Sequence, residues 1–214
     1  MDLVLLWGWT SNDASDKRLL DLTPKGWNVY TVPLFHLISD GNLNKFEHKI
    51  LELIEKKNLK KPILAGHSLG AALAVKFAAR YSSQIEQLIL VDSEGVPTGD
   101  SVYGLFKKVV RSHLQEKGQV ERDHLKTLLQ LLSHPKYTAH LIKMALTIDV
   151  QEEATTLTVP TQILWGEQDL VIPLEQGKRL HQLIKSSDLK VFKGMDHNWI
   201  LHSPELFWQE ISLP

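Results

Sequence analysis

The sequence predicts an α/β fold in which about six parallel strands form one sheet and helices flank it. Three observations support this prediction. Short apolar segments alternate with longer amphipathic segments along most of the chain. A length of 214 residues with 43% apolar residues suits a single globular domain. No internal repeat or low-complexity tract interrupts the pattern.

The strands and helices are expected in alternating order along the chain, which is the order of a parallel sheet with crossover helices. Short apolar runs predict strands near residues 2–7, 27–32, 62–66, 87–92, 160–165 and 189–193. Apolar residues at helical spacing predict helices near 13–22, 43–57, 69–81, 173–185 and 199–212.

The third strand is joined to its helix by the sequence Gly66-His67-Ser68-Leu69-Gly70, which reads G-x-S-x-G. Strand, sharp turn and helix form the setting of a nucleophile elbow, which strains the serine backbone and projects the hydroxyl above the sheet. A side chain at Gly66 or Gly70 would collide with the neighbouring strand or helix. The motif therefore predicts that Ser68 is a nucleophile, and the alternative is an ordinary glycine-rich turn.

A nucleophilic serine needs a base, and the base needs an acid that orients it. On this fold the chain order is serine, then aspartate or glutamate, then histidine. Asp169 follows the expected strand at 160–165, and His197 follows the strand at 189–193. Because parallel strands end at the same edge of a sheet, we expect both side chains near Ser68.

Four segments, in this order, resemble the α/β-hydrolase superfamily over nearly the whole chain. They are LVLLWGWTSN for the first strand and oxyanion loop, PILAGHSLGAALAVKFAARY for the elbow, VPTQILWGEQDLVIP for the acid turn and GMDHNWI for the histidine loop. The resemblance implies a triad of Ser68, His197 and Asp169, with backbone oxyanion donors from Leu69 and Trp9. The sequence departs from the family's usual pattern in that it starts at the strand leading into the oxyanion loop, so we expect a minimal version of the fold without the usual two antiparallel strands before it.

Three other acidic residues and one other histidine are candidates for the roles of acid and base. Asp92 ends the strand at 87–92, where some relatives carry the acid. Glu167 would be the acid only if the turn after the strand at 160–165 presents it in place of Asp169. Asp196 is expected to be a surface carboxylate of its loop. His67 occupies a variable position of the elbow and is given no catalytic geometry of its own.

Between about residues 95 and 156 the strand–helix alternation stops, and apolar residues recur at helical spacing in three runs. These runs lie at 102–114, 125–132 and 141–148. In the superfamily, helices inserted after the fourth strand form a cap that covers the serine. The expected organisation is thus a core of 1–94 and 157–214 with a cap of 95–156 in one structural domain; the alternative is a helical insertion that packs on the sheet edge.

Four side chains are candidates for the substrate pocket. Trp7 replaces the histidine that usually precedes the oxyanion-loop glycine, although core packing explains it equally well. His36 follows the second strand in the segment PLFH, which replaces the family's glycine-rich segment. Tyr103 and Phe106 lie in the first helical run of the expected cap.

The amino-acid composition makes several classes of partner and active site less favourable for this protein. A net charge of −1 gives no electrostatic reason to expect nucleic acid or a charged membrane surface as a partner. The absence of cysteine excludes disulfides, zinc–thiolate sites and a thiol nucleophile. We expect no metal and no cofactor, because no His, Asp and Glu spacing matches a metal site. The apolar run at 3–7 is too short to span a bilayer or to act as a signal sequence, which favours a cytoplasmic protein.

The expected activity is hydrolysis of a small-molecule carboxylic ester through an acyl-enzyme. The same residues would also hydrolyse amides, thioesters or C–C bonds, and a serine at the elbow argues against dehalogenases and epoxide hydrolases, which carry aspartate there. The first segment also resembles esterases that act on pimeloyl-carrier-protein methyl esters. Basic residues of the expected cap could dock an acyl carrier protein, although charged helix faces are common: Lys107, Lys108, Arg111, Arg122 and Lys126. A non-catalytic binding protein of the same fold is the alternative from another class.

Overall fold

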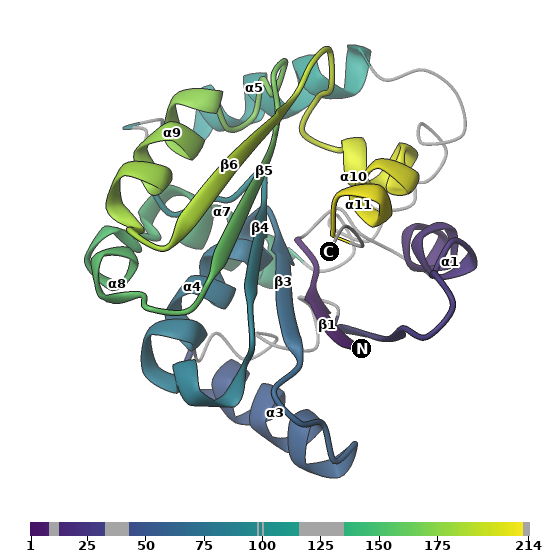
Figure 1. Ribbon diagram of the computed structural model, residues 1–214. Helices are drawn as coiled ribbons and strands as arrows, with labels where there is room; N and C mark the ends of the chain where they lie inside the picture. The colour runs from purple at the N-terminus through teal and green to yellow at the C-terminus, as the bar shows by residue number, and fades with distance from the viewer. Residues whose placement is uncertain (9–12, 33–42, 98, 100, 116–134, 212–214) are drawn as a thin grey trace.

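The computed structural model describes residues 1–8, 13–32, 43–97, 99, 101–115 and 135–211. In this part of the chain six strands form one parallel sheet in the order β2-β1-β3-β4-β5-β6 (Figure 1). The strands are β1 (Asp2–Leu6), β2 (Asn28–Val32), β3 (Ile63–His67), β4 (Leu88–Val91), β5 (Thr161–Gly166) and β6 (Ser187–Phe192). The predicted parallel sheet is therefore confirmed, and each strand lies within two residues of its expected place.

The sheet buries apolar side chains on both faces. In β1, Leu3 and Leu5 enter one apolar cluster, and Val4 and Leu6 enter the other, because successive side chains of a strand point to opposite faces. The central strands β3 and β4 are buried throughout, whereas the edge strand β2 is not. Burial on both faces explains why the central strands read as continuous apolar runs in the sequence.

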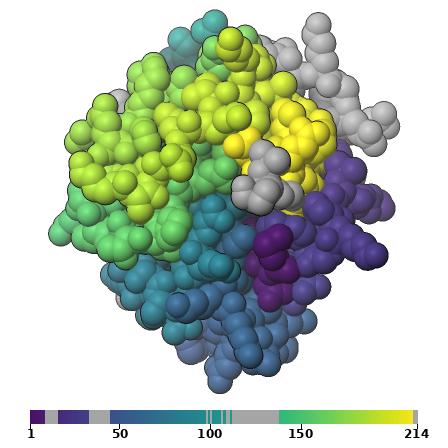
Figure 2. Space-filling model, in the orientation of Figure 1, coloured from purple at the N-terminus to yellow at the C-terminus, as the bar shows by residue number. Residues whose placement is uncertain are grey.

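Helices cover each face of the sheet (Figure 1). One cluster holds side chains from α3 (Leu43–Lys56), α4 (Leu69–Tyr81), α8 (Gln151–Thr156) and α9 (Leu174–Leu183). The short 3₁₀ helix η1 (Ser82–Gln84) follows α4. The opposite cluster holds side chains from α1 (Asp13–Asp21), α10 (Trp199–His202) and α11 (Pro204–Ile211). The helix α1 contacts α10 and α11. Figure 2 shows this contact from outside, where the yellow C-terminal helices lie beside the purple N-terminal part of the chain.

The last helix differs from its prediction. A single helix was expected over 199–212, but the chain forms α10 and α11, which are separated at Ser203. Ser203 has φ −134° and ψ 53°, outside the helical region. Proline disfavours helical geometry in the residue before it and cannot donate a backbone hydrogen bond, so Pro204 ends α10 and begins α11.

The insertion after β4 contains α5 (Val102–Gln115) and α7 (Pro135–Thr147), which contact each other. Two of the three expected helical runs are thus helical, and the run at 125–132 lies outside the described residues. The segment ends in α8, which packs against α4 and α9. Among the described helices, none is long and apolar enough to cross a membrane.

The register of the sheet brings four loops to one edge. His67 pairs with Val91, and Val91 pairs with Leu164, so β3, β4 and β5 end side by side. Gly166 of β5 then pairs with Phe192 of β6. The residues that follow these strands therefore meet at the carboxyl edge of the sheet, where ligands bind in open α/β sheets.

Candidate active site

Ser68 lies between the end of β3 and the start of α4 in a strained backbone conformation. Its φ is 55° and its ψ is −125°, a combination that side-chain-bearing residues rarely adopt. The backbone N–H donates to the carbonyl of Val91 at 2.9 Å, and the carbonyl accepts from the N–H of Ala71 at 3.0 Å. Bonds on both sides hold the turn in place, as a nucleophile elbow requires.

Two glycines allow the loop after β1 to approach this turn. A Cβ added at Gly8 would lie 2.9 Å from the Cβ of Ser68, and one added at Gly70 would collide with the carbonyl of Leu6. Leu69 is the first residue of α4, where backbone N–H groups have no partner within the helix. The serine thus lies between a helix N-terminus and the loop that leads to Trp9.

His197 links Ser68 to Asp169 through hydrogen bonds at both ring nitrogens. Its Nε2 lies 3.1 Å from Oγ of Ser68, and its Nδ1 lies 2.7 Å from Oδ2 of Asp169. Oδ1 of Asp169 accepts the backbone N–H groups of Val171 and Ile172, each at 2.8 Å. The carboxylate therefore has a fixed orientation, and it holds the imidazole with Nδ1 protonated and Nε2 free to accept the serine proton.

The charges around His197 set its strength as a base. Burial lowers the pKa of His197, but the charge and hydrogen bond of Asp169 outweigh this effect, and with Asp92 and Glu94 they raise the pKa to about 9. Burial in turn raises the pKa of Asp92 well above its usual range and that of Glu94 to about 8. Glu94 is therefore mainly protonated at neutral pH. The raised pKa makes His197 a stronger base, and the share of His197 in the neutral, proton-accepting form rises with pH.

A cavity of about 30 Å³ lies between the insertion and the turn that carries Asp169. Leu105 of α5 and Ile148 line it from the insertion, and Val171 and Ile172 line it from the turn. Its volume suits one water molecule or one small chemical group. Glu94 also lines the cavity, and its Oε2 is buried without a hydrogen-bond partner among the described residues.

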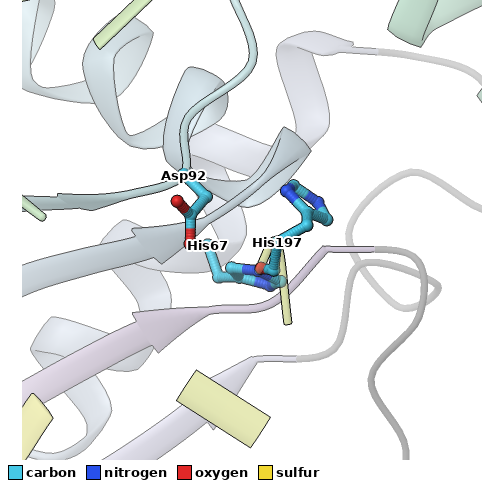
Figure 3. A group of neighbouring side chains, drawn as sticks. All are labelled: His67, Asp92 and His197. Atoms are coloured by element: carbon cyan, nitrogen blue, oxygen red, sulfur yellow. The ribbon is translucent and has the colours of Figure 1, made fainter. Parts of the chain in front are cut away.

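Two further buried groups lie beside His197, as Figure 3 shows. One polar atom from each of His67, Asp92 and His197 lies within 4.8 Å of the other two. Nε2 of His67 lies 3.0 Å from the carbonyl oxygen of His197, and Oδ1 of Asp92 accepts the N–H of Gly166 at 2.8 Å. Both ring nitrogens of His197 are already bonded to Ser68 and Asp169, so His197 offers no free ligand atom to a metal ion.

The sequence reasoning missed the contact between His67 and His197. The elbow motif places His67 beside the nucleophile, but no local pattern shows that its ring reaches the loop after β6. Asp92 is the alternative acid of the sequence, but its Oδ1 accepts the N–H of Gly166 at the end of β5, whereas Nδ1 of His197 bonds to Asp169. Glu167 bonds to the N–H of Gly194 and Asp196 bonds to His202, so neither replaces Asp169 as the partner of Nδ1.

The predicted pocket residues lie in different surroundings. Trp7 is buried in the core cluster on the α1 side of the sheet, with its ring edge-on to His67 at 6.0 Å. Tyr103 is 69% exposed, and Nζ of Lys107 lies 5.5 Å from its ring centre. Trp9, His36 and the side chain of Phe106 lie outside the described residues. A role in substrate binding stays a prediction for Trp7, His36, Tyr103 and Phe106, and the oxyanion role stays a prediction for Trp9.

Comparison with known proteins places this site in a family. The family model described as "Serine aminopeptidase, S33" matches residues 43–204. An uncharacterized protein of Mycobacterium tuberculosis is 22% identical over 74% of this chain, which spans only 57% of that relative's length. A pimeloyl-[acyl-carrier protein] methyl ester esterase of Aliivibrio fischeri is 25% identical, with 95% of this chain and 90% of the relative covered.

A solved structure supports the same fold. An α/β hydrolase from the sediment metagenome of the Mar Chica lagoon superposes with a TM-score of 0.70 at 21% identity, covering 99% of this chain and 89% of that chain. At this identity the likeness shows the fold alone. The matched family model covers more than half of the chain, and the chain therefore belongs to the serine aminopeptidase S33 family and is an α/β-hydrolase.

Proposed function

We propose that this hydrolase cleaves carboxylic esters through an acyl-enzyme formed on Ser68. The observation that carries the proposal is the hydrogen-bonded chain from Oγ of Ser68 through His197 to Asp169. All three side chains are buried at the carboxyl edge of the sheet, and the backbone of Ser68 is strained. A strained, buried serine with a base and an oriented acid matches the requirements of nucleophilic catalysis.

The reaction proceeds in two steps. Nε2 of His197 takes the hydroxyl proton as Oγ of Ser68 bonds to the ester carbonyl carbon, and His197 then protonates the leaving alcohol as the C–O bond breaks. In the second step, water gives a proton to Nε2 of His197 as its oxygen bonds to the acyl carbon; the bond from the acyl carbon to Oγ of Ser68 then breaks, His197 returns the proton to Oγ, and the acid is released. Asp169 remains ionised throughout and stabilises the imidazolium form of His197.

The backbone N–H groups of Leu69 and Trp9 are proposed to hold the oxyanion. Leu69 stands at the N-terminus of α4, where an unpaired N–H and the helix dipole favour negative charge. The close approach of Gly8 to Ser68 brings the start of the loop that leads to Trp9 next to the serine. One such donor typically contributes about 3 kcal/mol to lowering the barrier.

The insertion at 95–156 is proposed to act as a cap over the acyl group. Its support is the cavity beside Asp169, which α5 and the residues after α7 line together with the Asp169 turn. The relative from Aliivibrio fischeri carries the name of a methyl ester esterase, which favours esters over thioesters, amides and C–C bonds as the substrate class. Residues 1–94 and 157–214 would then form the catalytic core.

Hydrolysis of p-nitrophenyl esters of graded chain length tests the proposed activity. We expect turnover by the native protein and a loss of several orders of magnitude in kcat for Ser68→Ala. Ser83→Ala is the matched control, because Ser83 is exposed and outside the site. A Ser68→Ala variant that folds and keeps full activity would exclude the mechanism. No turnover by the native protein of any ester, thioester or amide would favour a non-catalytic binding protein instead.

A second candidate substrate is an acyl group attached to a carrier protein. Lys107 and Arg111 are exposed on α5 beside the cavity-lining Leu105, and the name of the Aliivibrio fischeri relative includes such a substrate. Arg122 and Lys126 lie outside the described residues, and Lys108 is half-buried. Changing Lys107 and Arg111 to Glu should raise KM for an acyl-carrier substrate in a salt-dependent way and leave small esters unaffected. Lys25→Glu with Lys60→Glu is the control for charge alone, and equal effects on both substrates would exclude carrier docking.

A further inference from the structure

Glu94 carries a buried carboxyl group that the proposed reaction does not use. It follows β4 and is 6% exposed, and its Oε2 has no hydrogen-bond partner among the described residues. Glu94 lines the cavity of about 30 Å³ that lies between the insertion and the turn that carries Asp169. Because buried polar groups in proteins are nearly always hydrogen-bonded, this carboxyl group is suited to bind a polar group that enters the cavity.

The backbone around Glu94 is held from three sides. The N–H of Glu94 donates to the carbonyl of Ser68 at 3.2 Å, and its carbonyl accepts the hydroxyl of Ser93 at 2.7 Å. The carbonyl of Gly95 accepts the N–H of Val150 at 2.9 Å, and a Cβ added at Gly95 would lie 2.5 Å from Cγ2 of Val150. The carboxyl group therefore extends from a fixed turn that is bonded directly to the elbow, as a preorganised binding group requires.

Gln176 of α9 is the second residue with a polar side chain among the described residues that line the cavity. It is 8% exposed. The remaining lining residues are apolar or glycine, and they include Leu105 and Ile148 of the insertion. A small, largely apolar cavity with two buried polar residues has the composition of a ligand subsite, in which apolar walls cover hydrocarbon and a few polar groups fix the orientation.

The charges nearby select the kind of group that fits this cavity. The negative charge of Asp169 reaches Glu94, and it disfavours a carboxylate in the same place. An ammonium group would need an ionised Glu94, but burial and Asp169 raise the pKa of this carboxyl group to about 8 against an opposing effect of His197. A hydroxyl group is neutral, and it can donate one hydrogen bond and accept another, so it can bond to Glu94 and Gln176 at once. It is also about as large as a water molecule, which the volume of the cavity suits.

We propose that Glu94 and Gln176 form a polar subsite that binds a hydroxyl group on the acyl chain of the ester substrate. The inference rests on the proposed function, because it names the class of ester that the enzyme would cleave. The subsite adjoins two members of the triad: Glu94 bonds to the carbonyl of Ser68, and the turn that lines the cavity carries Asp169. A substrate whose hydroxyl is bound there is therefore oriented relative to the nucleophile, while the apolar lining residues cover the carbon atoms next to the hydroxyl.

Matched pairs of esters test the subsite in the native protein. Each pair joins the ethyl ester of an ω-hydroxy acid with an ethyl alkanoate in which a methyl group takes the place of the hydroxyl, so both esters have the same number of non-hydrogen atoms. Acid release in a pH-stat gives kcat/KM for pairs of increasing chain length. At the chain length that reaches the cavity, we expect the hydroxy ester to be favoured about 10-fold or more. Equal values, or a preference for the alkanoate at every chain length, would overturn the proposal.

The ratio of kcat/KM for the hydroxy ester to that for the alkanoate isolates the subsite, because a merely structural defect lowers both values together. Glu94→Leu keeps a side chain of similar size without polar atoms, and the ratio should fall about 10-fold or more. Gln176→Leu should lower the ratio as well. Glu94→Gln keeps a donor and an acceptor, so its ratio should stay within about threefold of the native value. Glu175→Leu is the matched control with an unchanged ratio, because Glu175 is exposed on the same helix as Gln176.

An unchanged ratio in a folded Glu94→Leu variant would overturn the proposal, because the carboxyl group would then contact no part of the substrate. A preference for the ethyl ester of an ω-amino acid over both members of the pair would also overturn it, since the subsite would then bind an ammonium group. NMR titration of Ser68→Ala measures binding without turnover, and it should show tighter binding of the hydroxy ester than of the alkanoate; equal binding would contradict the subsite. Failure of the proposed function would appear separately, as an absence of ester turnover by the native protein.

Discussion

Replacing the buried Glu94 by glutamine should remove a pH-dependent loss of stability from the protein. Burial raises the pKa of this carboxyl group from the ordinary 4.5 to about 8, with a further rise from Asp169 and an opposing effect of His197. A raised pKa means that the folded state binds the proton more tightly than the unfolded state does. Glu94 therefore contributes most to stability below pH 4.5, and this contribution is lost as the pH rises through 8.

The size of the effect follows from the shift in pKa. One pKa unit corresponds to about 1.36 kcal/mol, so the shift of Glu94 sets an upper limit of about 5 kcal/mol on the loss of unfolding free energy. Glu94 lines a cavity large enough for a water molecule, which would reduce the cost of charging it. We therefore expect a loss of a few kcal/mol between about pH 5 and about pH 9 that the glutamine variant does not show.

Urea unfolding of the native protein, Glu94→Gln and Glu86→Gln at several pH values measures this difference. Glu86 is exposed and serves as the control for removing one acidic residue. The native protein and Glu86→Gln should lose stability in parallel as the pH rises, and Glu94→Gln should lose less. Parallel curves for all three proteins would show that Glu94 is already ionised in the folded state and would refute the reasoning.

Three other predictions concern the reaction. Asp169→Asn should lower kcat about 10⁴-fold, which corresponds to a barrier higher by about 5.5 kcal/mol, because the amide favours the wrong tautomer of His197. Steady-state kinetics should show this loss of kcat with an unchanged KM. In the native protein kcat/KM should rise with pH as His197 loses its proton, with a midpoint at about 9, and a rate that falls over this range would contradict a neutral base. Leu105→Ala should shift the preference toward bulkier acyl groups more than Tyr103→Ala does, because Leu105 lines the cavity and Tyr103 is exposed. A panel of esters measures this preference, and a larger shift in Tyr103→Ala than in Leu105→Ala would place the pocket elsewhere.

The sheet and the meeting of Ser68, Asp169 and His197 could be predicted from the sequence for the same physical reason. In a parallel α/β sheet, every strand ends at one edge, so residues that follow the strands gather there whatever the details of the loops. The elbow motif predicts Ser68 as the nucleophile, and chain order predicts the base and the acid. The structure brings the three side chains within hydrogen-bonding distance, and their part in catalysis is the proposal made above.

Other features depend on side-chain directions that no local pattern encodes. The ring of His67 reaches a carbonyl in a loop 130 residues later in the chain, and the sequence contains no signal for this contact. The burial of Glu94 depends on α5, α7 and the Asp169 turn closing together around it. The division of the last helix into α10 and α11 is different, because Pro204 was visible in the sequence and marks the break.

The most direct test of the central claim is covalent labelling of the native protein with a fluorophosphonate, followed by peptide mass spectrometry. The account predicts one adduct, on Ser68, formed at a rate that falls sharply in Asp169→Asn, because the serine is reactive only while His197 is oriented and basic. An adduct on another residue, or labelling of Ser68 at an unchanged rate in Asp169→Asn, would contradict the account.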